Sequence, residues 1–224
     1  MILNSQYNVA AGNSLSVRIA GYQRRRMYEA FLATIQPGPE DTILDLGVTD
    51  DQEYDHSNYF VAWYPHKNRI TAAGLDDASF LATRYPGVTF QHADGCALPF
   101  ADRSFDFVHS SAVLEHVGDH ARQVRFLGEC WRVARRGLFL TTPNRWFPVE
   151  FHSVLPLVHW LPHAAFARIL RMRGLDALAK IENLNLMSRS TLVRAARQAG
   201  VPAAIQSVAL AGWTTNLLLA AKKQ

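Results

Sequence analysis

The sequence predicts an α/β fold built on a doubly wound, largely parallel sheet. Two observations predict it: short apolar segments alternate with helical segments through the first 143 residues, and most apolar segments end in small or acidic residues. Buried strands that lead into turns have this pattern, and strand–helix–strand units form parallel sheets with right-handed crossovers. A length of 224 residues is ordinary for one α/β domain, so we expect a single domain over residues 1–224.

The expected elements follow from periodicity and from helix- and turn-breaking residues. A helix over residues 15–36 ends at Pro37, and a last helix over 190–199 ends at Gly200. Further helices are expected over 59–64, 78–85 and 120–134, and strands over 42–47, 70–75, 88–92, 105–110 and 137–141. Residues 144–187 break the alternation, so we expect a helical insertion there. Two strands on either side of Gly212 predict a closing hairpin.

Composition and charge narrow the possible partners. Hydrophobic residues make up 49% of the chain and charged residues 19%, which excludes a disordered chain. Residues 41–119 carry thirteen acidic and four basic side chains, whereas residues 120–224 carry four acidic and fifteen basic ones. A uniform nucleic-acid binder would be basic throughout, so a nucleic-acid partner is not expected. The later arginines fit a solvated helix face, and peripheral contact with an anionic membrane is an alternative.

The expected cellular location is the cytoplasm. Cys96 and Cys130 are too few and too far apart in the sequence for a disulfide framework or a zinc cage, which fits a reducing compartment. The first residues do not have the pattern of a secretory signal, and no apolar run reaches the roughly 20 residues of a membrane span.

Acidic residues follow the first three expected strands. Gly47, in ILDLGVTD, lacks a side chain and so lets a ligand approach the backbone, while the acids around it favour a cationic ligand over a pyrophosphate. In nucleoside-binding sheets an acid after the second strand accepts hydrogen bonds from ribose hydroxyls. Asp76 has this position, and Asp77 fits a helix cap better. Asp94, after the third strand, can accept from an adenine amino group.

LPF at residues 98–100 and FDFVHSSAVLEHV at residues 105–117 complete an ordered set of motifs. With them the sequence resembles class I S-adenosylmethionine-dependent methyltransferases. The resemblance implies a three-layer, Rossmann-like sheet of about seven strands whose last strand is antiparallel. It also implies S-adenosyl-L-methionine as cofactor. Where the family usually has DxGxGxG, this chain has Val48, Thr49 and Asp50 after Gly47.

The resemblance also implies the residues that contact each part of the cofactor. Asp45 and Gly47 would flank the methionine part, Asp76 would hold the ribose, and Asp94 would contact the adenine. Gly95 and Cys96 would line the adenine pocket, with Ser110 and Ser111 beneath the cofactor. The full expected set is Asp45, Gly47, Val48, Thr49, Asp76, Asp77, Asp94, Gly95, Cys96, Ser110 and Ser111.

The segment after the fifth strand is the expected acceptor side. It is rich in large apolar side chains, which suits either a lid over a small or lipid-like acceptor or a helical cap on the sheet. If the acceptor atom is oxygen, a base must take its proton. His152, oriented by Glu150, is the first candidate and His116 the second. The spacing from His152 to His159 matches no compact metal-ligand pattern, so we expect no metal site.

Two other functions are compatible with these motifs. A non-catalytic cofactor-binding or partner module could keep the same fold, since fold does not determine function. An RNA methyltransferase would use the arginine-rich second half, and its binding would weaken steeply with salt.

Overall fold

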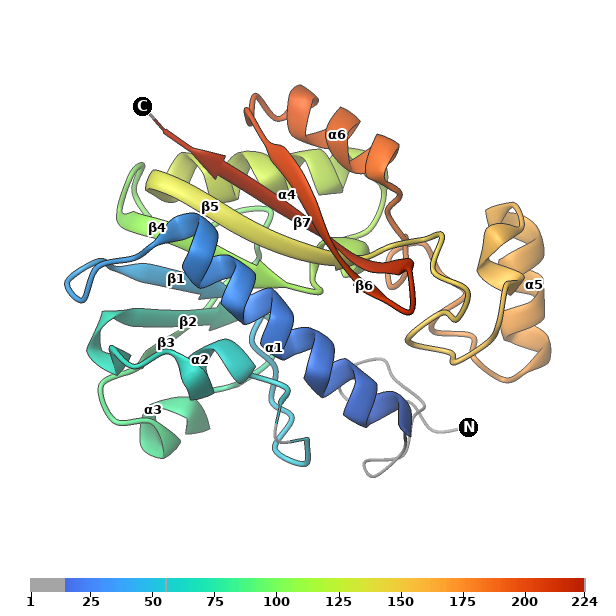
Figure 1. The fold of residues 1–224 in the computed structure, drawn as a ribbon, viewed down its shortest axis with the longest axis horizontal. Helices are drawn as coiled ribbons and strands as arrows, with labels where there is room; N and C mark the ends of the chain where they lie inside the picture. The colour runs from blue at the N-terminus through green and yellow to red at the C-terminus, as the bar shows by residue number, and fades with distance from the viewer. Residues whose placement is uncertain (1–14, 55, 224) are drawn as a thin grey trace.

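The computed structural model describes residues 15–54 and 56–223 (Figure 1). Within them, seven strands form one sheet in the order β3-β2-β1-β4-β5-β7-β6. The strands are β1 (Ile43–Leu46), β2 (Ile70–Gly74), β3 (Thr89–His92), β4 (Phe105–Ser111), β5 (Ala134–Pro143), β6 (Ala204–Leu210) and β7 (Trp213–Lys222). The first five run parallel, and β7 pairs antiparallel with both β5 and β6. This confirms the expected seven-stranded sheet with an antiparallel last strand.

Helices cover both faces of the sheet, as expected for a three-layer fold. The helix α1 (Leu15–Ile35) crosses one face, on the same side as α2 (Tyr59–Trp63) and α3 (Phe80–Arg84). Helices α4 (His120–Val133) and α6 (Arg189–Gln198) cover the other face. Phe31 on α1 and Phe126 on α4 are fully buried, so each helix closes its own half of the core.

Local capping sets where the helices on the second face begin. The Asp119 side chain accepts a hydrogen bond from the Arg122 backbone N–H at 2.9 Å, at the start of α4. Ser188 and Thr191 form a reciprocal capping box at the start of α6. On α1, Met27 and Phe31 are buried whereas Tyr22 is 57% exposed, so the buried stripe of the helix is narrower than its apolar pattern.

The order of the strands reverses at β1, which positions the site. From β1 the chain builds outward through β2 to β3 on one side, and then β4 starts the other side. Leu46 at the end of β1 is in register with Ala73 on β2 and with Ser110 on β4. The connections that leave these strand ends diverge at such a point, so ligand crevices of doubly wound folds open there.

Residues 144–187 form a separate small layer beside the end of the sheet. They contain the short 3₁₀ helix η3 (Val158–Trp160) and α5 (His163–Met172), which stands away from the sheet in Figure 1. Phe166 and Leu170 are buried in a cluster of their own. An isolated bridge between Asn144 and Met187 joins the two ends of the segment. None of the described helices is long and apolar enough to cross a membrane.

Candidate functional site

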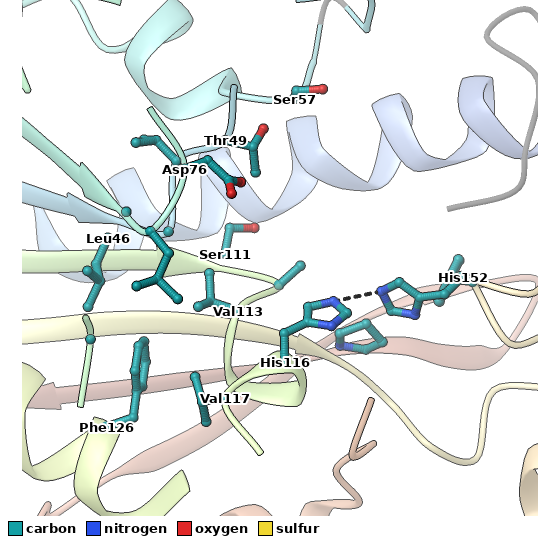
Figure 2. Close-up of a pocket in the computed structure, with 18 of the residues that line it drawn as sticks. Leu46, Thr49, Ser57, Asp76, Ser111, Val113, His116, Val117, Phe126 and His152 are labelled. Carbon is teal, nitrogen blue, oxygen red and sulfur yellow. Dashed lines mark hydrogen bonds between the residues drawn. The ribbon is translucent and has the colours of Figure 1, made fainter. Parts of the chain in front are cut away.

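A cavity of about 310 Å³ opens at the carboxyl ends of β1, β2, β3 and β4 (Figure 2). Its walls come from those strand ends, from α1, from α4 and from the segment after β5. Seven of the residues expected to bind the cofactor line it: Gly47, Val48, Thr49, Asp76, Asp94, Gly95 and Ser111. The strand ends thus bring together residues that lie up to 64 positions apart in the sequence.

The other four expected cofactor residues lie behind or beside the cavity wall. Asp45 is buried and accepts a hydrogen bond from His109 Nδ1 at 2.6 Å. Ser110 is buried within β4, and the buried thiol of Cys96 faces the Arg122 carbonyl at 3.5 Å. Asp77 accepts a hydrogen bond from the Ser79 backbone N–H at 3.1 Å, but the N-cap residue of α3 is Ser79, so Asp77 precedes the cap instead of forming it.

The loop after β1 is held by side chains where the family pattern has glycines. Gly47 has φ +97°, and a Cβ there would lie 2.0 Å from a Val113 methyl carbon. The Thr49 backbone N–H donates to Asn58 Oδ1 at 3.0 Å, and Asn58 Nδ2 donates back to the Thr49 carbonyl at 3.0 Å. Asp51 accepts from the Glu53 backbone N–H at 2.9 Å and from the Ser57 hydroxyl. The loop therefore keeps a defined path without a second glycine.

Two carboxylates lie on the strand-end rim of the cavity. Partial burial and the charge of Asp50 raise the pKa of Asp76 above its ordinary value. Asp94 accepts from the Cys96 backbone N–H at 2.9 Å, and its other oxygen lies 3.5 Å from Arg122 Nη2. The Asp76 carboxylate can therefore accept further hydrogen bonds, whereas the charge of Asp94 is already partly balanced by Arg122 and one of its oxygens already accepts a hydrogen bond.

One part of the cavity wall is apolar. Leu46, Val113 and Phe126 gather there in Figure 2. Gly95 leaves space beside Phe126, since a Cβ on Gly95 would come within 2.4 Å of the ring. Carboxylates next to an apolar slot are the combination that a nucleoside requires, so these residues fit the expected cofactor.

On the acceptor side the structure brings together all three expected catalytic residues. His152 Nδ1 donates to Glu150 Oε1 at 2.7 Å, and His152 Nε2 lies 3.0 Å from His116 Nε2 (Figure 2). Glu150 is buried and also accepts from the backbone N–H and hydroxyl of Ser153, both at 2.6 Å. Both histidines line the cavity, and Glu150 supports His152 from behind.

Burial and mutual contact shift the pKa values of these groups apart. Burial alone would raise the pKa of Glu150, but the charge and hydrogen bonds of His152, with those of Ser153, lower it to about 2. Burial lowers the pKa of His152, but the charge and hydrogen bond of Glu150 raise it by more, so the net effect is a raised pKa. Burial and the His152 charge lower the pKa of His116 to about 3. His152 is therefore the histidine of this pair that holds a proton more readily.

Sequence reasoning missed several residues of the site. Gln23, Arg24 and Met27 of α1 line the cavity, although the arginine run to which Arg24 belongs had no assigned role. Burial lowers the pKa of Arg24. Arg122 was expected on a solvated helix face, but it lies at the cavity beside Asp94.

Glu115 was also missed. It is fully buried behind His116, and burial raises its pKa to about 7. Its place in the LEHV motif was the only signal in the sequence.

Comparison with known proteins shows that part of the chain is similar to a known family. Residues 58–141 match the sequence profile of a methyltransferase domain family. A probable S-adenosylmethionine-dependent methyltransferase of Mycobacterium tuberculosis (strain ATCC 25618 / H37Rv) is 45% identical over 81 residues, which are 34% of this chain. The match covers only 28% of that relative's length.

Solved structures extend the similarity over most of the chain. An S-adenosylmethionine-dependent methyltransferase from Mesorhizobium loti has a TM-score of 0.59 and 16% identity, over 88% of this chain and 97% of that one. Geranyl diphosphate C-methyltransferase from Streptomyces coelicolor has a TM-score of 0.58 and 14% identity, over 92% and 80%. Phosphoethanolamine N-methyltransferase 2 from Haemonchus contortus has a TM-score of 0.59 and 14% identity, over 90% and 52%. At these identities the likeness establishes the fold.

Proposed function

We propose that the chain is a class I S-adenosylmethionine-dependent methyltransferase that methylates a hydroxyl oxygen of a small or lipid-like acceptor. The family match over residues 58–141 and the fold support this proposal. The cofactor is S-adenosyl-L-methionine, which supplies an electrophilic methyl group on a sulfonium. The relatives named above act on different acceptor atoms, so the choice of oxygen depends on the residues of this chain.

The strand-end residues support the cofactor half of the proposal. The Asp76 carboxylate accepts from the ribose hydroxyls, and Asp94 receives the adenine amino group beside the apolar wall. Gly47 leaves its backbone open to the methionyl part. Ser111 lies at the cavity, and Asp45 acts from behind the wall by fixing His109.

The proposal that the acceptor atom is oxygen depends on the hydrogen-bonded series Glu150–His152–His116 at the cavity. A hydroxyl is a weak nucleophile until its proton is removed, and a positioned histidine commonly removes it. His152 has a buried carboxylate on Nδ1 at 2.7 Å, which stabilises the ring after Nε2 takes up a proton. His116 faces the same Nε2 and, with its lowered pKa, leaves the proton on His152.

The segment 144–187 supports an apolar acceptor. Phe151 lines the cavity and stacks on Phe147, with ring centres 5.1 Å apart and planes 3° apart. Large apolar side chains also lie exposed on this segment, including Trp146 at 50% and Leu157 at 49%. We therefore assign residues 144–187 as the acceptor-side insertion of one methyltransferase domain that spans the chain.

Release of S-adenosylhomocysteine tests the proposal. The protein is incubated with S-adenosylmethionine and fractionated small-molecule and lipid extracts, and each methylated product is identified by mass spectrometry. His152→Gln is expected to lower kcat about 100-fold or more while the Kd for S-adenosylhomocysteine stays within about threefold. His120→Gln is the matched control, because His120 is bonded to Gln198 outside the cavity.

Each other outcome identifies an alternative. Cofactor binding without turnover in any extract would favour a non-catalytic module. Methylation of co-purified RNA, with retention that falls steeply with salt, would favour an RNA methyltransferase. Methylation of carbon or nitrogen with unchanged kcat in His152→Gln would contradict the role of the histidine.

A further inference from the structure

The ring nitrogens of the two cavity histidines, His116 and His152, are arranged as metal ligands would be. The Nδ1 of His116 donates to the Asn183 carbonyl at 2.6 Å, and the Nδ1 of His152 donates to Glu150 at 2.7 Å. In the neutral rings both Nε2 atoms therefore carry lone pairs, and these atoms lie 3.0 Å apart. Metal-bound histidines in proteins are usually fixed in this way, with the other ring nitrogen donating to a carbonyl or a carboxylate.

The distances match a shared metal ion. At the right angle of octahedral coordination, two metal–nitrogen bonds of about 2.1 Å hold their nitrogens about 3.0 Å apart and their ring centres about 4.6 Å apart. At the tetrahedral angle usual for zinc the same separations are about 3.4 Å and about 5.3 Å. The structure has 3.0 Å between the Nε2 atoms and 4.7 Å between the ring centres. Rings that face each other directly across one hydrogen bond of about 3.0 Å would have centres about 5.3 Å apart.

A buried carboxylate oxygen provides a second, independent observation. Oε1 of Glu115 has no hydrogen-bond partner within the described residues, although the side chain is fully buried. It lies 3.9 Å from His116 Nε2, and the nearest ligand atoms of Glu115, His116 and His152 all lie within 4.8 Å of one another. The other oxygen, Oε2, accepts from the Thr142 hydroxyl at 2.9 Å, which fixes the orientation of the carboxylate.

We propose that Glu115, His116 and His152 bind one divalent transition-metal cation at the acceptor end of the cavity. Two imidazoles and one carboxylate suit zinc, cobalt or iron, and the nitrogen ligands disfavour magnesium and calcium. Glu150 supplies a negative charge near the cation, and Glu115 would bind the cation as a carboxylate. Since His116 and His152 line the cavity, the remaining coordination positions face the space where the acceptor would bind.

Metal binding and the proposed proton transfer exclude each other at His152, because the cation would use the Nε2 lone pair that takes up the proton in that reaction. Metal binding is measured without cofactor or acceptor, so an inactive enzyme leaves the test valid.

Calorimetric titration of chelator-stripped, tag-free full-length protein with Zn²⁺ tests the proposal. One equivalent is expected to bind with micromolar or tighter affinity, and Mg²⁺ is expected not to bind. His116→Gln and His152→Gln are each expected to weaken zinc binding about 100-fold. Glu150→Gln, which removes only the charged support of His152, should weaken it about 10-fold to 100-fold. The exposed-site control His120→Gln should bind zinc like the wild type.

A second measurement covers variants that fail to fold. Crystals of the wild type soaked in Zn²⁺ should give an anomalous peak within bonding distance of both Nε2 atoms. No zinc binding by wild type at millimolar Zn²⁺, or a peak elsewhere in the molecule, would overturn the proposal. So would equal affinity in a folded His116→Gln variant.

Discussion

Asp76→Ala is the sharpest test of the cofactor half of the cavity. Asp76 follows β2 and lines the cavity, and among the described residues no side chain or backbone group donates a hydrogen bond to its carboxylate. A hydrogen bond to a charged group contributes about 1.5–3 kcal/mol. Because Asp76 is largely exposed, the lower value applies to each of two ribose hydroxyls, giving about 3 kcal/mol. That corresponds to about a 100-fold weaker Kd for S-adenosylhomocysteine.

Calorimetric titration with S-adenosylhomocysteine measures this change, and Asp77→Ala is the matched comparison. Asp77 is the adjacent carboxylate, is exposed, and bonds to the Ser79 backbone. Its removal is expected to leave the affinity within about threefold, because Asp77 is not among the residues that line the cavity. An Asp76→Ala protein that is folded and binds as tightly as wild type would refute the assignment of the ribose to this carboxylate.

Three further predictions concern backbone, packing and pH. Gly47→Ala should destabilise the fold by about 2 kcal/mol and weaken S-adenosylhomocysteine binding, because its Cβ would overlap Val113 at positive φ; an unchanged melting temperature would contradict this. Gly128→Ala, in α4 with open space around the new Cβ, should raise the free energy of unfolding by about 0.5–1 kcal/mol in urea titrations. Hydrogen bonds from Arg132 lower the pKa of Glu129 below its ordinary value of 4.5, so the stabilisation exists above that value and is lost as pH falls through the folded-state pKa. The stability difference between wild type and Glu129→Gln should therefore shrink on acidification, and a pH-independent difference would contradict the shift.

The regular elements were predictable because their signals are local. The sheet strands were visible as short apolar segments, and α4 began at its capping aspartate. The start of β5 was predicted wrongly because charged residues lie inside the strand. The expected strand begins at residue 137, whereas β5 begins at Ala134 and includes Arg135 and Arg136. Arg135 pairs with Asp106 and Arg136 with Asp41, so ion pairs at the sheet end accommodate two charged residues that look like a loop in the sequence.

The position of a cavity residue could be predicted where a local motif determines it. Asp76 and Asp94 follow strands, and parallel strand ends must meet at one edge. The contacts of His116 with Asn183 and His152 depend instead on how the segment 144–187 folds back, which no local pattern encodes. The same holds for Arg24, since its helical periodicity cannot show which part of α1 overhangs the strand ends.

The end of the segment 144–187 is tied to the turn that carries the LEHV motif. The Asn185 backbone N–H donates to the Glu115 carbonyl at 2.7 Å, and Asn185 Nδ2 donates to the Gly118 carbonyl at 2.9 Å. Gln123 of α4 donates to the Asn185 carbonyl at 3.0 Å. These bonds join the end of the segment 144–187 to the turn that contributes His116 and Val117 to the cavity wall, so the two form one mechanical unit. If a ligand bound at one part of this unit changes the affinity for a second ligand at the other part, thermodynamic reciprocity requires the second ligand to change the affinity for the first by the same factor.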